Sequence, residues 1–181
     1  RHNNGFLITP SGKKYSSLKV KDIVFVSLDG KYEKKYKPSS EWRFHQDIYV
    51  KKKDAQAIVH THSTNATALS VHKKPIPAFH YMVALAGGND IKCAKYATYG
   101  TRELSKNILK ALNNRKACLI ANHGQIAFDN NLSDAFELAQ EVENLSLQYI
   151  TALKLGKPKI LSINEMNKVL KKAKNYKRDN K

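Results

Sequence analysis

The sequence has only two cysteines and no long hydrophobic run. Cys93 and Cys118 are too few for the disulfide framework of a small secreted protein and lie among apolar or mixed neighbours. We therefore expect buried free thiols in a reducing compartment, the cytoplasm. No apolar stretch approaches the roughly 20 residues of a transmembrane helix, and the first residues show no secretory signal pattern. We therefore expect no membrane partner.

Acidic residues are also scarce. The chain has 15 Asp and Glu against 32 Lys and Arg, and its formal net charge is +17. Such an excess is typical of proteins that bind nucleic acids, anionic membrane surfaces or small anionic substrates. The lysines are spread along the chain, and arginines do not alternate with aromatic residues as they do in single-strand binders. We expect a lysine-rich surface without a nucleic-acid partner.

Hydrophobic patterning predicts an α/β protein in which helices cover a mixed or antiparallel sheet. Runs of apolar and β-branched residues predict strands at 5–9, 22–28, 56–62, 117–122 and 125–128. Amphipathic spacing and capping residues predict helices at 38–53, 63–72, 101–114, 133–156 and from 162 onward. The 181 residues are enough for one domain with a sizeable core, and we find no repeat or linker.

Two histidines end the predicted strand at 56–62. Alternate residues of a strand face the same side, so His60 and His62 project together and can chelate one metal ion. A third ligand has to come from elsewhere, and His123 is the best candidate because it follows another buried strand and precedes Gly124, which allows a tight turn. Three histidines with an open fourth position describe a catalytic zinc site. Polar residues at a strand end, without metal, are the alternative interpretation.

A carboxylate and two serine-containing turns are further candidates. Glu41 falls in the first turn of the predicted helix at 38–53, where it either complements the helix dipole or has a chemical role. Ser39 and Ser40 precede it, and the N–H groups of a helix start bind phosphate well. Ser11 and Gly12 form a second turn of this kind. Each turn alone is weak evidence because such turns are common.

Five segments together resemble one protein family. The segments "PSSEWRFH", "AIVHTHS", "PIPAFHYMVALAGGNDI", "YATYGTREL" and "ANHGQIAF" are similar, in this order, to the class II aldolase and adducin family, and most closely to its L-fuculose-1-phosphate aldolase branch. The similarity covers nearly the whole chain. It implies a three-layer α/β/α sandwich with a largely antiparallel central sheet. It also implies a homotetramer with active sites at the subunit interfaces.

The resemblance assigns roles to individual residues. One Zn²⁺ per subunit is bound by His60, His62 and His123, and Glu41 is a catalytic carboxylate that also approaches the metal when substrate is absent. Ser11, Gly12, Ser39 and Ser40 match residues that hold the substrate phosphate. The remaining assignments are tyrosines: Tyr81 is the acid/base that reaches a neighbouring subunit's site, and Tyr99 and Tyr176 lie at the aldehyde end of the substrate.

The resemblance also implies an activity, the retro-aldol cleavage of a ketose 1-phosphate. The leading substrate is L-fuculose 1-phosphate, which gives dihydroxyacetone phosphate and L-lactaldehyde. Family members that share the site are the alternatives: L-ribulose-5-phosphate 4-epimerase, methylthioribulose-1-phosphate dehydratase or aldolase, and aldolases for other ketose 1-phosphates. A non-enzymatic domain of the adducin type is disfavoured because the set of histidines and Glu41 is intact.

One family feature is missing. A Gly-Asn-x-Ser segment, whose asparagine helps to bind phosphate, precedes the first strand in the family, and this sequence begins after that point. We therefore expect residues 1–181 to be a single class II aldolase domain that lacks an N-terminal segment.

Overall fold

A four-stranded sheet lies at the centre of the structure, a computed structural model that describes the backbone of residues 1–179 and the side chains of residues 1–173. Its strand order is β3-β8-β7-β6. The strands are β3 (Ala57–Thr61), β6 (Cys93–Ala94), β7 (Ala117–Ile120) and β8 (Gly124–Asp129). The pairs β3–β8 and β8–β7 are antiparallel, and only the short β6 runs parallel to its neighbour β7. The predicted largely antiparallel sheet is thereby confirmed.

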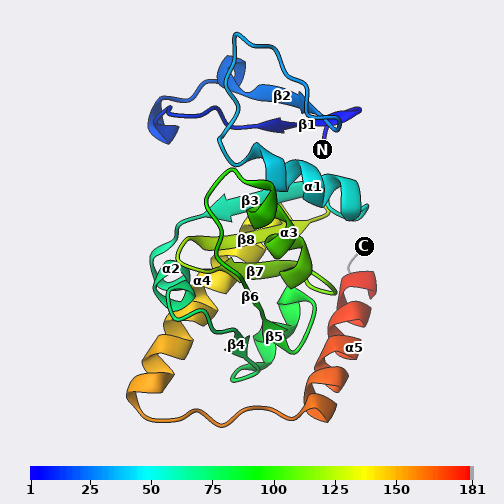
Figure 1. The fold of residues 1–181 in the computed structure, drawn as a ribbon. Helices are drawn as coiled ribbons and strands as arrows, with labels where there is room; N and C mark the ends of the chain where they lie inside the picture. Colours follow the sequence, from blue (N-terminus) through cyan, green and yellow to red (C-terminus); the bar gives the residue numbers. More distant parts are fainter. Residues whose placement is uncertain (180–181) are drawn as a thin grey trace.

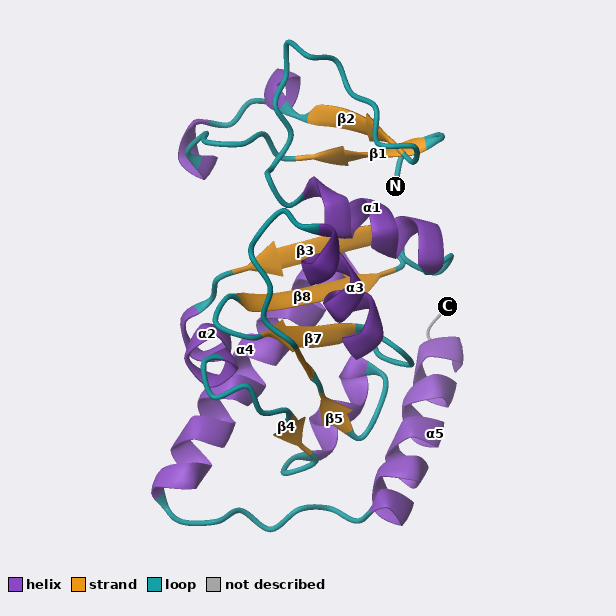
Figure 2. Ribbon diagram, in the orientation of Figure 1, coloured by secondary structure: helices purple, strands orange, loops and turns teal. Residues whose placement is uncertain are grey.

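Helices cover both faces of this sheet (Figures 1 and 2). Alternate residues of β7 enter two separate cores, with Cys118 and Ile120 in one, and Ala117 and Leu119 in the other. The first core includes residues of α1 (Trp42–Lys51) and α3 (Arg102–Ala111), and the second includes residues of α2 (Thr64–Ser70) and α4 (Leu132–Lys154). The molecule is therefore the expected three-layer α/β/α sandwich.

An N-terminal hairpin adds to the first core. Its strands β1 (Gly5–Ile8) and β2 (Val24–Ser27) pair antiparallel and lie against α1 (Figure 1). Two short 3₁₀ turns, η1 (Tyr15–Ser17) and η2 (Val20–Asp22), form the connection between them. Phe6 and Val26 are fully buried, and the rings of Phe6 and Tyr49 are 5.2 Å apart. Aromatic packing thus attaches the hairpin to α1.

The segment between α2 and β6 has little regular structure. It contains the two-residue strands β4 (Ile76–Pro77) and β5 (Asp90–Ile91), which pair, and the 3₁₀ helix η3 (Tyr81–Ala86). The last helix, α5 (Ile163–Asp179), packs against η3 (Figure 1). None of the helices in residues 1–179 is both long and apolar enough to cross a membrane.

Most predicted elements match the observed ones within a few residues, but the start of α1 was predicted wrongly. The helix begins at Trp42, so Glu41, which was predicted in the first turn, occupies the N-cap position with φ −97° and ψ 9°. Pro38 instead forms an isolated antiparallel β-bridge with Pro10, which follows β1 of the N-terminal hairpin. Ser39 and Ser40 thus belong to a loop that connects the hairpin to the helix.

Candidate active site

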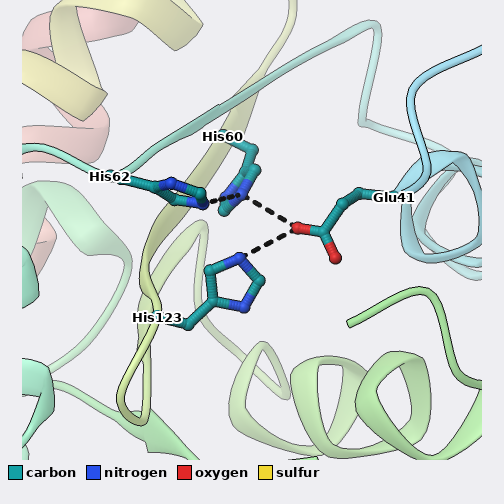
Figure 3. A group of neighbouring side chains, drawn as sticks. All are labelled: Glu41, His60, His62 and His123. Carbon is teal, nitrogen blue, oxygen red and sulfur yellow. Dashed lines mark hydrogen bonds and ion pairs between the residues drawn. The ribbon is translucent and has the colours of Figure 1, made fainter. Parts of the chain in front are cut away.

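Four side chains that could hold a metal ion meet at one edge of the central sheet. Glu41, His60, His62 and His123 each offer one ligand atom, and these atoms all lie within 4.8 Å of one another (Figure 3). Glu41 comes from the start of α1, His60 and His62 from the end of β3, and His123 from the loop between β7 and β8. The structure therefore brings together the three predicted metal ligands and the predicted catalytic carboxylate.

Strand geometry sets the positions of His60 and His62. His60 is in β3 and His62 follows its last residue, and their Nε2 atoms are 3.2 Å apart, as expected for side chains two residues apart on one strand face. The His60 Nδ1–H donates to the carbonyl oxygen of Gln125 at 2.8 Å. Because a carbonyl oxygen only accepts, this bond fixes the proton on Nδ1 of a neutral His60 and leaves a lone pair on Nε2. That lone pair is available for a metal ion.

The position of His123 depends on a tight β7–β8 loop. Ile120 pairs with Gly124, so the loop has three residues, and His123 N–H donates to the Ile120 carbonyl at 3.0 Å. The left-handed residue in this turn is Asn122, with φ +54°, and not Gly124 as we expected. Gly124 is required for a different reason: a Cβ there would lie 2.3 Å from the carbonyl oxygen of Thr61. Its missing side chain lets His123 approach the histidines at the end of β3.

The Glu41 carboxylate faces the histidines from the opposite side. It is 7% exposed, and Oε2 lies 2.9 Å from His123 Nε2 and 3.1 Å from His60 Nε2. Oε1 accepts a hydrogen bond from Gly100 N–H at 3.3 Å. Burial alone raises the pKa of Glu41, but His123 and His60, whose rings attract the carboxylate when they are protonated, outweigh this and hold the pKa well below its ordinary value. The group is therefore an ionised carboxylate at neutral pH.

This donor set fits a divalent metal ion. Oε2 of Glu41 is buried, and neither contact to an imidazole nitrogen gives it a hydrogen bond within the described residues. His60 presents a lone pair to the same point, and at most one proton can lie between His60 Nε2 and His62 Nε2. A cluster of lone pairs and a carboxylate charge is stabilised by a cation at its centre, and three imidazoles with a carboxylate are ordinary metal ligands.

The two loops predicted to bind phosphate lie side by side. Ser11 N–H donates to the Lys37 carbonyl and Ser39 N–H donates to the Thr9 carbonyl, both at 2.9 Å. Ser39 Oγ also accepts from Glu41 N–H at 3.3 Å. The amides of Gly12 and Ser40 have no protein acceptor among the described residues, so they are the N–H groups available to an anion. Gly12 has φ +71° and open space around it.

Among the described side chains, neither Tyr81 nor Tyr99 makes a hydrogen bond or ring contact with the metal ligands of the same chain. Tyr81 begins η3, is 54% exposed and contacts His80 in a tilted arrangement with ring centroids 4.8 Å apart. Tyr99 is 68% exposed and directly precedes Gly100, whose amide binds Glu41. Tyr176 belongs to α5, but its side chain lies outside the described residues.

Two residues of the site were missed by sequence reasoning. Gly100 binds Glu41 through its amide and has φ +73°, which a glycine adopts readily. Gln125 is 1% exposed and orients His60 through its carbonyl oxygen. Gln125 could have been found from the sequence, since it is a large polar residue beside the apolar run 126–128 in a buried strand.

Comparisons with known proteins identify the family of the chain. The family model described as the Class II Aldolase and Adducin N-terminal domain matches residues 1–150. A 5-methylthioribulose-1-phosphate/5-deoxyribulose-1-phosphate aldolase from Rhodospirillum rubrum is 51% identical over 97% of this chain and 80% of its own length. An L-fuculose phosphate aldolase from Escherichia coli O6:H1 is 50% identical over 97% of this chain and 82% of its own length.

Solved structures give the same result for the fold. A structure of an L-fuculose 1-phosphate aldolase superimposes with a TM-score of 0.91 at 42% identity, covering 94% of this chain and 81% of the other. From the family match, the identities and the superposition, the chain belongs to the class II aldolase and adducin family, and it is a metal-dependent aldolase, a carbon–carbon lyase.

Proposed function

We propose that this chain is a zinc-dependent aldolase that cleaves a ketose 1-phosphate into dihydroxyacetone phosphate and an aldehyde. The observation that supports it most directly is the convergence of three imidazole nitrogens and one carboxylate oxygen within 4.8 Å. Imidazole ligands favour Zn²⁺ over hard ions such as Mg²⁺ or Ca²⁺. Histidines as neutral ligands leave the charge of the ion uncompensated, as an electrophilic site requires.

The cleavage breaks the bond between C3 and C4 of the ketose. A divalent ion bound by His60, His62 and His123 supplies Lewis-acid stabilisation of the negative charge that develops on the C2 oxygen. The proton of the C4 hydroxyl leaves as the bond breaks, and C3 gains a proton afterwards. Glu41 is the proposed proton carrier for C3, because its carboxylate is ionised and lies at the metal ligands.

Tyr81 is the proposed acid/base at the C4 hydroxyl, and it acts in a neighbouring subunit. Its ring is 54% exposed and lies on η3, apart from the helix and strands that carry the metal ligands. A homotetramer with sites at subunit interfaces would bring this ring to the histidines of the next copy. Analytical ultracentrifugation should then show a tetramer, and a monomer with full activity would contradict the assignment of Tyr81.

The two serine loops form the proposed phosphate site. Ser11, Gly12, Ser39 and Ser40 offer hydroxyl groups and free amides on adjacent loops, and Ser39 contacts the amide of Glu41. Phosphate held there would orient the reacting carbons at the metal through binding energy remote from the breaking bond. We place Tyr99 and Tyr176 at the aldehyde end, and for Tyr99 the support is its position next to Gly100, which binds Glu41.

The proposed substrate is L-fuculose 1-phosphate, which would give L-lactaldehyde. The support is the 50% identity to an L-fuculose phosphate aldolase. A relative named as a 5-methylthioribulose-1-phosphate/5-deoxyribulose-1-phosphate aldolase is 51% identical, so these two sugar phosphates are the second candidates. All three are 1-phosphates of ketoses whose last carbon carries no hydroxyl group. We place the enzyme in the cytoplasm, supported by the free thiols of Cys93 and Cys118.

One experiment tests this function. Zn²⁺-loaded protein is incubated with each of the three ketose 1-phosphates and with L-ribulose 5-phosphate, and dihydroxyacetone phosphate is measured by a coupled reductase assay. We expect release from at least one ketose 1-phosphate, and loss of release after removal of metal with a chelator. No release from any of them, with epimerisation of L-ribulose 5-phosphate, would replace the aldolase proposal by that of an epimerase.

A further inference from the structure

The helix that directly follows the metal-binding strand is not capped by its own residue. Ser63 occupies the N-cap position of α2, immediately after His62, but its side chain makes no capping hydrogen bond. Ser63 Oγ instead accepts from the Gln125 side-chain amide at 2.9 Å. A serine at this position normally binds the second or third amide of the helix, so those two amides need another acceptor.

Glu143, on α4, is that acceptor. Its Oε1 accepts from both the backbone amide and the side-chain amide of Asn65 at 2.8 Å, and its Oε2 accepts from Ala66 N–H at 2.9 Å. Burial raises the pKa of Glu143, but the hydrogen bonds from the two backbone amides outweigh this and lower it. The ionised carboxylate is also favoured by the positive end of the helix dipole. The start of α2 is thereby attached to a helix 78 residues away in sequence.

Gln125 completes the attachment from the other side. Its side chain donates both to Ser63 Oγ and to the Ala139 carbonyl of α4, each at 2.9 Å, while its backbone carbonyl accepts from His60 Nδ1. The backbone on both sides of His62 is therefore tied to α4 and β8. Gln125 thereby also contacts the metal ligand His60, whereas the hydrogen bonds of Glu143 go to the start of α2.

His62 itself has no such support. Its ring has only one hydrogen-bond partner in the described part of the chain, the neighbouring ligand His60. Metal-binding histidines usually donate their second ring nitrogen to a carboxylate or carbonyl, which fixes the ring. Without that bond, the position of this ring depends on the backbone of residues 61–65.

We propose that Glu143 is a positioning residue for the metal site, which holds the start of α2 and through it sets the place of His62. The inference rests on the metal site of the proposed function. Glu143 acts through the backbone of α2 and not on the substrate. Its removal loosens the connection between α2 and α4, and His62 spends less time at the distance from His60 and His123 that one metal ion requires.

The test measures metal affinity and needs no substrate. Apo protein is titrated with Zn²⁺ in competition with a chromophoric chelator, and the absorption spectrum of the Co²⁺-substituted protein reports ligand geometry. We expect Glu143→Ala to raise the Kd for Zn²⁺ by about tenfold, the lower end of the range for residues that orient metal ligands, and to change the Co²⁺ spectrum. Glu143→Gln keeps one acceptor oxygen, so we expect an intermediate Kd.

Glu141→Ala is the matched control, because Glu141 lies two residues before Glu143 on α4 and makes no hydrogen bond or ion pair in the described region. Its Kd should equal that of the wild type. A folded Glu143→Ala protein with unchanged Kd and Co²⁺ spectrum overturns the inference, even if its thermal stability has dropped. If Glu143→Ala does not fold, an unchanged Kd in Glu143→Gln decides against it. Absence of Zn²⁺ binding by the wild type would reject the metal site itself.

Discussion

A single methyl group added at Gly124 should distort the metal site and weaken metal binding. In Gly124→Ala, the new Cβ would lie 2.3 Å from the Thr61 carbonyl oxygen and 3.2 Å from the Cα of His62. Real Cβ atoms essentially never approach closer than 3.0 Å, so the start of β8 has to move about 0.7 Å away from the end of β3. Both obstacles include backbone atoms, and no side-chain rotation relieves them.

This displacement separates His123 from His60 and His62. Metal–ligand distances tolerate shifts of about 0.2 Å, so a movement of about 0.7 Å exceeds the tolerance several-fold. We expect Gly124→Ala to weaken Zn²⁺ binding by at least about tenfold. We also expect the overpacking to cost about 1–3 kcal/mol of unfolding free energy, which lowers Tm by roughly 2–4 °C per kcal/mol in a chain of this size.

The assays are chelator competition for Zn²⁺ affinity and thermal unfolding of the metal-free protein. Gly156→Ala is the control: Gly156 has φ +124° and no atom within 4 Å of an added Cβ, so the substitution strains the backbone without steric contact. We expect it to lower stability by about 1–2 kcal/mol and to leave Zn²⁺ affinity unchanged. A Gly124→Ala protein that binds Zn²⁺ as tightly as the wild type would refute the reasoning, because it would show that the close approach does not set the ligand geometry.

Four further predictions concern the ligands, the proton carriers and the thiols. His62→Ala should lose bound zinc and activity together, measured by metal analysis and aldehyde release; retention of stoichiometric zinc would count against this ligand. Glu41→Gln should keep zinc but lower kcat by about 10²–10⁴-fold, the range for a general acid/base; an unchanged kcat would rule out its role as proton carrier. Tyr81→Phe should slow C–C cleavage more than proton exchange between dihydroxyacetone phosphate and D₂O, and equal losses would contradict the division of labour. Burial raises the pKa of the half-buried Cys93 to about 11 and also raises that of the fully buried Cys118. Both thiols should therefore stay protonated at pH 8 and react slowly with iodoacetamide until the protein is unfolded, whereas fast labelling of the native protein would contradict the raised pKa values.

The metal site could largely be predicted from the sequence because its geometry is local. Two-residue alternation along β3 places His60 and His62 on one face, whatever the rest of the fold. His123 followed from its place after a buried strand and from family resemblance. The role of Gly124 was predicted wrongly, since the reason for a glycine there is the carbonyl of Thr61, which lies 63 residues earlier in the chain and is invisible to local patterns.

Contacts between distant segments account for the other differences. Pro38, Ser39 and Ser40 satisfy the local rules for a helix start, but the bridge from Pro38 to Pro10 keeps these residues out of the helix, which begins at Trp42. Gly100 and Glu143 act through hydrogen bonds to residues 59 and 78 positions away, and no periodicity predicts such pairs. The segment containing η3 packs against α5, which lies far from it in the sequence, and a local pattern cannot reveal such a contact.

Each of the two serine loops begins with a proline, and the two prolines are bridged to each other. The pyrrolidine rings fix φ at both positions, and the hydrogen bonds from Ser11 to Lys37 and from Ser39 to Thr9 restrict the residues that follow. A flexible loop loses conformational entropy when it closes on an anion, roughly 1–2 kcal/mol per residue ordered. Loops that are already rigid lose much less, so a phosphate bound at the proposed site would keep more of its interaction energy as affinity.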